Sequence, residues 1–177
     1  MIRAHELRQN NAAEYILYMW QTEDLLRALK FDFTLIEQKL IAGTNDSEDE
    51  KEELRQWYRS LMAQMESENI MNHGHLKTIQ VRLKELEFFH RLLLEQTDAV
   101  KYRQLYQVAQ HNINEFRQTK GNQNLGDVEA CLTALYGLLV LHLQNKKVTN
   151  ATGQAMQTFS ALMSELSLAF KESEAAL

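Results

Sequence analysis

The sequence lacks proline entirely and contains one cysteine and six glycines among its 177 residues. Without proline, no residue removes a backbone donor or clashes with the preceding turn, so long helices are favoured. The single cysteine, Cys131, excludes an intramolecular disulfide framework. The low glycine count and the absence of proline exclude collagen-like and linker-rich chains. With 45% hydrophobic and 24% charged residues, the chain has the composition of one ordinary globular domain.

Signals for export, membrane insertion and nucleic-acid binding are also missing. Residues 1–10 contain no apolar stretch followed by a small-residue cleavage site. The longest uncharged apolar run, residues 130–143, is shorter than the roughly 20 residues of a membrane-spanning helix. The net charge is −5, and the basic residues between positions 75 and 120 are interleaved with acidic ones, which argues against a nucleic-acid partner. With a free thiol and no export signal, we expect a cytoplasmic protein with neither a membrane nor a nucleic-acid partner.

Hydrophobic residues recur at three- and four-residue spacing along most of the chain, which is typical of amphipathic helices. Most glycines fall between these periodic segments and mark their boundaries. The stripe before Thr97 is out of phase with the stripe after Asp98, which predicts a break there with either residue as N-cap. We therefore expect an all-α, single-domain bundle of about five to six helices with no strands. Helical segments are predicted over residues 11–30, 33–41, 48–73, 75–96, 98–119, 127–145 and 154–171.

Local signals refine the ends and the burial of these segments. Ser47 and Glu50 have the capping-box pattern before the third segment, and Asp127 is expected to cap the sixth. That sixth segment is hydrophobic on nearly all sides, which predicts the most buried helix of the bundle. Gly137 lies within it, and we expect another helix to approach closely there. Residues 146–153 are predicted to form a polar loop, and the tail 172–177 is expected to fray.

The first candidate site is the aromatic and charged cluster of the segment 11–30. Glu23 shares a mostly apolar face with Trp20, so its carboxylate must be paired or solvated. Arg27 is four residues away, a spacing that suits an ion pair within one helix. The cluster forms either the polar floor of a ligand cleft or a core pair that fixes helix packing or dimer register. Its members are Tyr15, Tyr18, Trp20, Glu23, Asp24 and Arg27.

The second candidate is the pair Glu87 and His90. A Glu-x-x-His pair is half of the di-iron site of ferritin-like bundles, but no second pair is present. A metal- or small-ligand-binding bundle that uses this partial site is therefore the alternative hypothesis. In the simpler interpretation, His90 packs among leucines and hydrogen-bonds to Glu87. Cys131 lies among leucines and is expected to be an unreactive core thiol.

Three stretches carry a resemblance to a known family. Residues 12–28, residues 127–137 and residues 159–166 together resemble a family of small uncharacterised all-helical bacterial proteins, a domain of unknown function. The resemblance implies a helical cytoplasmic protein and no activity, cofactor or catalytic residue. Because the first stretch coincides with the cluster around Glu23, that cluster is the leading candidate for a binding surface or cleft.

The functional hypothesis follows from what the helices contain. The chain has seven methionines, seven phenylalanines, six tyrosines and two tryptophans. It contains no recognisable catalytic motif, which argues against an enzymatic function. Aromatic residues and methionine are enriched at protein interfaces, although they also fill cores. We therefore expect a non-enzymatic interaction module without a cofactor, which binds a protein partner or itself, with a homodimer or other homo-oligomer as the simplest form.

Overall fold

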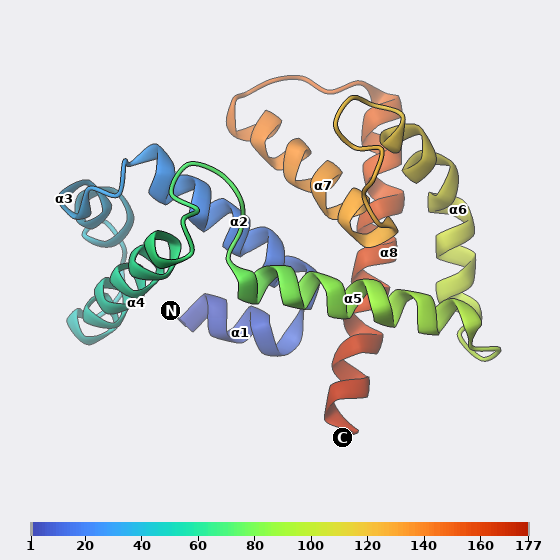
Figure 1. Ribbon diagram of the computed structural model, residues 1–177, viewed down its shortest axis with the longest axis horizontal. Coiled ribbons are helices and arrows are strands. Elements are labelled where there is room, and N and C mark those ends of the chain that lie inside the picture. Colours follow the sequence, from blue (N-terminus) through green and yellow to red (C-terminus); the bar gives the residue numbers. More distant parts are fainter. Residues whose placement is uncertain (1, 177) are drawn as a thin grey trace.

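The computed structural model describes residues 2–176, which form eight α-helices and one short π-helix without a strand (Figure 1). The expected all-α class is confirmed, but the expected count of five to six helices is too low. The elements are α1 (Ile2–Asn10), α2 (Ala12–Ala28), α3 (Phe33–Ile36), the π-helix η1 (Glu37–Ile41), α4 (Glu48–Ser67), α5 (Lys77–Glu95), α6 (Val100–Arg117), α7 (Asp127–Leu143) and α8 (Asn150–Ala175).

Several predicted boundaries need correction. Helix α1 was not expected, because only three of its residues are apolar. Helix α4 ends at Ser67 rather than at residue 73, since Asn69 adopts a φ of 57° and turns the chain. Helix α8 begins at Asn150, inside the predicted loop, because the Thr149 side chain accepts a hydrogen bond from the Thr152 N–H at 3.1 Å. It continues to Ala175, so most of the tail that was expected to fray is helical.

The helix caps show which local signals are reliable. The capping box is confirmed, with the Ser47 N–H donating to Glu50 Oε2 at 2.9 Å. This hydrogen bond lowers the pKa of the Glu50 carboxyl. The break between α5 and α6 is confirmed, but its N-cap is Ala99 rather than Thr97 or Asp98. The N-cap of α7 is Gly126, so the expectation that Asp127 fills this position is also wrong.

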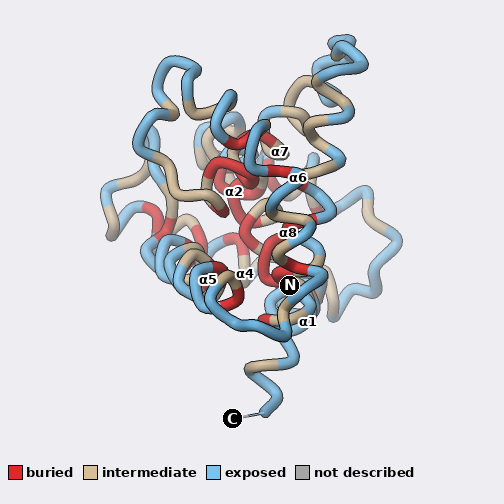
Figure 2. Tube along the Cα trace, turned by 90° about the vertical axis from the view of Figure 1, so that its right-hand side faces the viewer, coloured by how far each residue is buried: buried red, intermediate tan, exposed pale blue. Residues whose placement is uncertain are grey.

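Helix α8 runs through the middle of the molecule and packs against α1, α2, α5, α6 and α7 (Figure 1). The buried part of the chain follows α2, α7 and α8 (Figure 2). Fully buried side chains such as Ile16, Leu132 and Phe159 form this core. The segment of α3, η1 and α4 lies at the opposite side of the molecule from α6 (Figure 1).

Helix α7 is not the most buried helix that its composition predicts. Its buried residues all lie between Val128 and Ala134, whereas α2, which has the same length, buries more residues. The last residue of α7, Leu143, is 63% exposed. The reason is geometric, because α7 leaves the centre of the bundle at its C-terminal end (Figure 1). Within residues 2–176, no helix combines the length and the apolar composition needed to cross a bilayer.

Candidate functional site

Glu23 is the fully buried carboxylate of the first candidate cluster, with 0% of its surface exposed. Its Oε1 accepts the backbone N–H of Leu76 at 3.0 Å, and its Oε2 lies 2.5 Å from Nδ1 of His75. Leu76 is the N-cap of α5 and offers no side-chain cap of its own. Glu23 therefore brings an acceptor from α2 to the N-terminus of α5, where a negative charge also suits the helix dipole.

Arg27 does not pair with Glu23, as its spacing suggested, but with Asp24. The guanidinium Nη1 lies 2.8 Å from Asp24 Oδ1, and Nη2 donates to the carbonyl oxygens of Ile70, at 3.0 Å, and Gly74. The Tyr136 hydroxyl donates to the other Asp24 oxygen at 2.5 Å. Burial and this contact with Asp24 raise the pKa of Tyr136. Arg27 thus fixes the connection between α4 and α5 against the outer side of α2.

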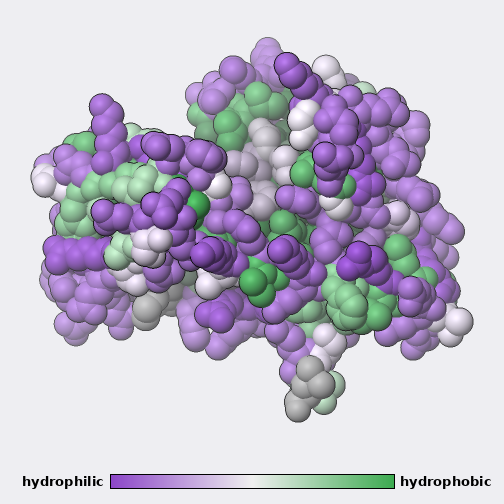
Figure 3. Space-filling view, in the orientation of Figure 1, coloured by the Kyte–Doolittle hydropathy of each residue, from purple (hydrophilic) through white to green (hydrophobic). Residues whose placement is uncertain are grey.

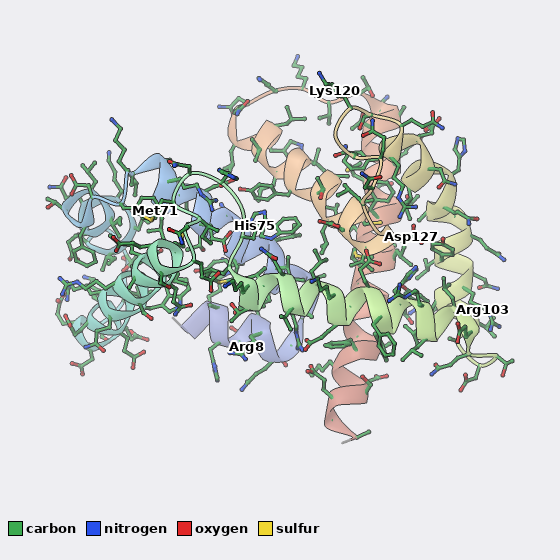
Figure 4. All side chains as sticks on the ribbon, in the orientation of Figure 1. Arg8, Met71, His75, Arg103, Lys120 and Asp127 are labelled. Atoms are coloured by element: carbon green, nitrogen blue, oxygen red, sulfur yellow. The ribbon has the colours of Figure 1, made fainter. Side chains whose placement is uncertain are left out.

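Aromatic rings complete this cluster around Trp20. Its indole stacks on the His75 ring at 4.7 Å and meets Tyr136 edge-on at 5.9 Å. We call Trp20, Glu23, Asp24, Arg27, His75 and Tyr136 the Glu23 network. His75 lies in the connection that precedes α5, at the near end of that helix (Figure 4). Neither His75 nor Tyr136 was assigned to this cluster from the sequence, because both lie far along the chain from Glu23.

Two tyrosines of the predicted cluster lie apart from this network. Tyr18 stacks on Trp57 of α4 at 6.2 Å, and the Arg3 guanidinium lies 5.7 Å from its ring centre. Tyr15 lines a cleft that is bounded by α1, α4, α5 and α8. The structure therefore brings four of the six predicted residues together and directs the other two toward α4 and this cleft.

Glu87, of the second candidate pair, reaches the N-terminus of α7. Its Oε1 accepts the backbone N–H of Glu129 at 2.9 Å. A Cβ atom at Gly126, the N-cap of α7, would lie 2.0 Å from the same oxygen. Only glycine leaves room for the carboxylate there. Burial raises the pKa of Glu87, although the hydrogen bond from Glu129 opposes this effect.

His90, its partner in the sequence motif, is 2% exposed and uses both ring nitrogens. Nδ1 lies 2.6 Å from the Tyr102 hydroxyl, and Nε2 lies 3.2 Å from Asp127 Oδ2. Asp127 also accepts the Tyr106 hydroxyl at 2.8 Å and pairs with Arg117 at 2.6 Å. We call Glu87, His90, Tyr102, Tyr106, Arg117 and Asp127 the Glu87 network. Asp127 lies where the start of α7 meets α5 and α8 (Figure 4).

The electrostatics of the Glu87 network are dominated by Asp127. Burial alone would raise the pKa of this carboxyl, but hydrogen bonds from His90 and Tyr106 and the charge of Arg117 lower it to about 2. Burial and the hydrogen bond to Asp127 raise the pKa of Tyr106 to about 12. Burial also raises the pKa of the Cys131 thiol, as expected for a core cysteine. The network therefore holds one ionised carboxylate between neutral hydroxyls and a guanidinium.

This arrangement bears on the metal hypothesis. His90 directs its nitrogens to Tyr102 and Asp127, and Glu87 directs its carboxylate to α7, so the two side chains do not converge on a common point. No hydrogen bond joins them, contrary to the simpler interpretation. Within the part of the chain that the structure describes, no group of three or more His, Cys, Asp or Glu side chains could hold a metal ion.

The comparisons with known proteins agree with the resemblance found in the sequence. The model of a family described as a domain of unknown function, DUF4924, matches residues 1–176. No curated protein and no solved structure matches the chain. The match covers nearly every residue, including both networks. The chain therefore belongs to the DUF4924 family, a domain of unknown function.

Proposed function

We propose that this protein is a non-enzymatic helical interaction module that associates with a second copy of itself through the C-terminal half of α7. The observation that carries the proposal is the incomplete burial of this half of the helix, which contains no Asp, Glu, Lys or Arg. Between Glu129 and Lys146 the sequence contains no Asp, Glu, Lys or Arg. Nevertheless, residues 135–143 are only partly covered or exposed. Hydrophobic surface gathers over this end of α7 (Figure 3).

A helix that is apolar on all sides is normally buried on all sides. The first half of α7 meets this expectation, because it packs against α5, α6 and α8. The second half carries Leu138, Leu139, Val140 and Leu141, none of which is buried, and ends at the exposed Leu143. Covering these side chains would remove apolar surface from water at roughly 25 cal/mol per Å². An additional protein surface is the natural cover.

Gly137 supports the same proposal. Glycine inside a helix costs about 1 kcal/mol relative to alanine. The close approach of another helix that the sequence suggested is not found within the chain, because Gly137 is exposed and a Cβ atom there would meet nothing within 4 Å. In the proposed assembly a helix of the second copy approaches at this point, where the missing side chain lets two backbones come close.

A second copy fits this surface better than a charged partner does. Most homodimers have a two-fold axis, which sets one patch against its own duplicate. A patch without Asp, Glu, Lys or Arg meets itself with little repulsion, whereas a charged partner would leave its own charges unpaired. The non-enzymatic part of the proposal is supported by the two networks, whose carboxylates and His90 are engaged by protein groups rather than open to a substrate.

Sedimentation of two matched variants tests this proposal. Leu143→Lys places a charge on the proposed interface, whereas Val108→Lys places the same charge on α6 at a site that is 64% exposed, close to the 63% of Leu143. We expect the wild type and the Val108 variant to sediment as dimers at micromolar concentration and the Leu143 variant as a monomer. A wild type that stays monomeric, or equal effects of both variants, would contradict the proposal.

A further inference from the structure

A cleft of about 1070 Å³ opens between α1, α4, the start of α5 and the end of α8. It includes neither the C-terminal half of α7 nor the His90 side chain. Its volume slightly exceeds the usual range of small-molecule sites, which is roughly 300–1000 Å³. We call it the cationic cleft. Its lining includes residues of both chemical kinds that an amphiphilic ligand requires.

The apolar part of the cationic cleft is built from six side chains. Met19, Leu61 and Leu76 are at most 4% exposed and contribute buried apolar surface. Trp57 and Tyr15 add partly exposed aromatic rings, and Val81 is 53% exposed. Aliphatic and aromatic side chains of this kind can hold the hydrocarbon part of a ligand.

The charged part of the cleft is positive, although the whole chain carries a net charge of −5. Arg8, Lys77, Arg82 and Lys171 line it, against the two carboxylates Glu85 and Glu174. Both carboxylates are bound by Arg82, at 3.1 Å and 2.7 Å. Among the described residues, no ion pair joins the other three cations to a carboxylate. Arg8 projects from α1 (Figure 4).

Tyr15 contributes a hydroxyl group to the cationic cleft. Burial is the largest effect and raises its pKa, the positive charges of Arg8 and Arg82 oppose this rise, and the negative charge of Glu23 adds to it. At neutral pH the hydroxyl therefore stays protonated. The hydroxyl makes no hydrogen bond to another described residue, so its O–H is available as a donor to a ligand beside Arg8.

We propose that the cationic cleft binds a small amphiphilic anion, in which a carboxylate is joined to an unbranched hydrocarbon chain. The carboxylate lies between Arg8 and the Tyr15 hydroxyl, and the hydrocarbon chain lies along Met19, Leu76 and Trp57. This site is independent of the proposed self-association, because none of its residues belongs to α7. Failure of one proposal leaves the other standing.

Calorimetry with three ligands of equal chain length tests the proposal on the full chain. Decanoate, decylammonium and decanol each have an unbranched chain of ten carbons and differ in charge. We expect saturable binding of decanoate and at least about tenfold weaker binding of the other two, because neither offers an anionic acceptor to Arg8. Decanoate is also expected to change the tryptophan fluorescence, and Trp57→Phe should abolish this change while Trp20 remains.

A pair of charge variants locates the headgroup. Arg8→Gln is expected to weaken decanoate binding about tenfold, because it removes one charged donor. Lys147→Gln removes an equal charge from the exposed connection between α7 and α8 and is expected to leave binding unchanged. Both residues are exposed, so circular dichroism should show unaltered helix content.

Four results would overturn the proposal. The first is an absence of saturable decanoate binding, and the second is equal binding of decylammonium or decanol. The third is undiminished binding by Arg8→Gln. An acidic amphipathic peptide that binds the cleft when decanoate does not would also overturn it, because the partner would then be a protein segment.

Discussion

The Glu23 and Glu87 networks differ in how they shield the same kind of contact. In each, a carboxylate from one helix accepts a backbone N–H at the start of another helix whose own N-cap provides no side-chain acceptor. In each, a histidine lies nearby. The side chain of His75 is 35% exposed, however, whereas that of His90 is 2% exposed.

This difference separates two ways of holding charge in a helical bundle. Glu23 is itself fully buried and relies on two donors, the Leu76 N–H and His75. The polar groups of the Glu87 network come from α5, α6 and α7. Asp127 by itself makes three contacts, which are hydrogen bonds with His90 and Tyr106 and an ion pair with Arg117. We infer that the loss of a single group destabilises the Glu23 network. The Glu87 network is instead destabilised by added volume at Gly126 and by protonation of Asp127.

The largest expected effect is that of Glu23→Ala, which breaks the less redundant network. The substitution leaves the Leu76 N–H and His75 without their buried acceptor and creates a cavity. We expect the free energy of unfolding to fall by about 3–4 kcal/mol in urea denaturation. Asp24→Ala is the control, because its side chain is 49% exposed and should cost only about 1 kcal/mol. Equal losses would show that burial does not distinguish the two carboxylates.

Gly126→Ala tests whether the Glu87 network is limited by space. The new Cβ would lie 2.0 Å from Glu87 Oε1, so the carboxylate must leave its position. We expect a loss of about 1–3 kcal/mol in the free energy of unfolding. The double variant with Glu87→Ala should lose less than the sum of the single changes, because the clash is then absent. Gly43→Ala, where nothing lies within 4 Å, is the matched control. Additive losses would mean that Glu87 is not the obstacle.

Asp127→Asn tests the response of the Glu87 network to protonation. The pKa of Asp127 is about 2 in the folded protein, below its ordinary value of about 4. The folded chain thus binds fewer protons than the unfolded chain in this range, and its stability falls as the pH falls from about 4 to 2. Asp127→Asn removes this contribution and should therefore reduce the stability lost between about pH 4 and 2 by about 1–2 kcal/mol, after allowance for solvent screening.

Wild type and variant must be compared in the acid titration, because the pKa shift of Glu87 changes stability with pH in the opposite direction to that of Asp127. Burial raises the pKa of Glu87, so the folded protein holds this proton more tightly and loses some stability when the pH rises through that pKa. The difference between wild type and Asp127→Asn isolates the Asp127 contribution. An unchanged slope between about pH 4 and 2 would contradict the lowered pKa.

The parts of the fold that the sequence predicted are those with local causes. Hydrophobic spacing predicted most helices, and the Ser47 capping box needs only residues three apart. Helix α1 lacks such a signal, and its buried Ala4 belongs to a helix that packs on α2 and α8. These contacts stabilise a segment that its own sequence does not mark as amphipathic.

The networks show why site residues were only partly predictable. The spacing rule assigned Arg27 to Glu23, but Asp24 is closer on the exposed side of the helix, while Glu23 turns to a histidine 52 residues away. Likewise Glu87 and Asp127 were each named from the sequence separately, but the contact of Glu87 with the start of α7 depends on the packing of α5 against α7. The residue types therefore predicted which positions belong to a polar cluster, whereas tertiary packing determines which residues form hydrogen bonds with one another.

The smallest expected effect distinguishes the two glycines of α7. Gly126 faces Glu87, whereas Gly137 faces open space within the chain. Under conditions where the protein is monomeric, Gly137→Ala should raise the free energy of unfolding by about 0.5–1 kcal/mol, because alanine is the better helix former. If a second copy packs on α7 as proposed, the same methyl group intrudes on the interface and sedimentation should show weaker self-association. A stabilised chain with undiminished self-association would move the interface away from Gly137. A destabilised monomer would instead mean that the helix is already closely packed there.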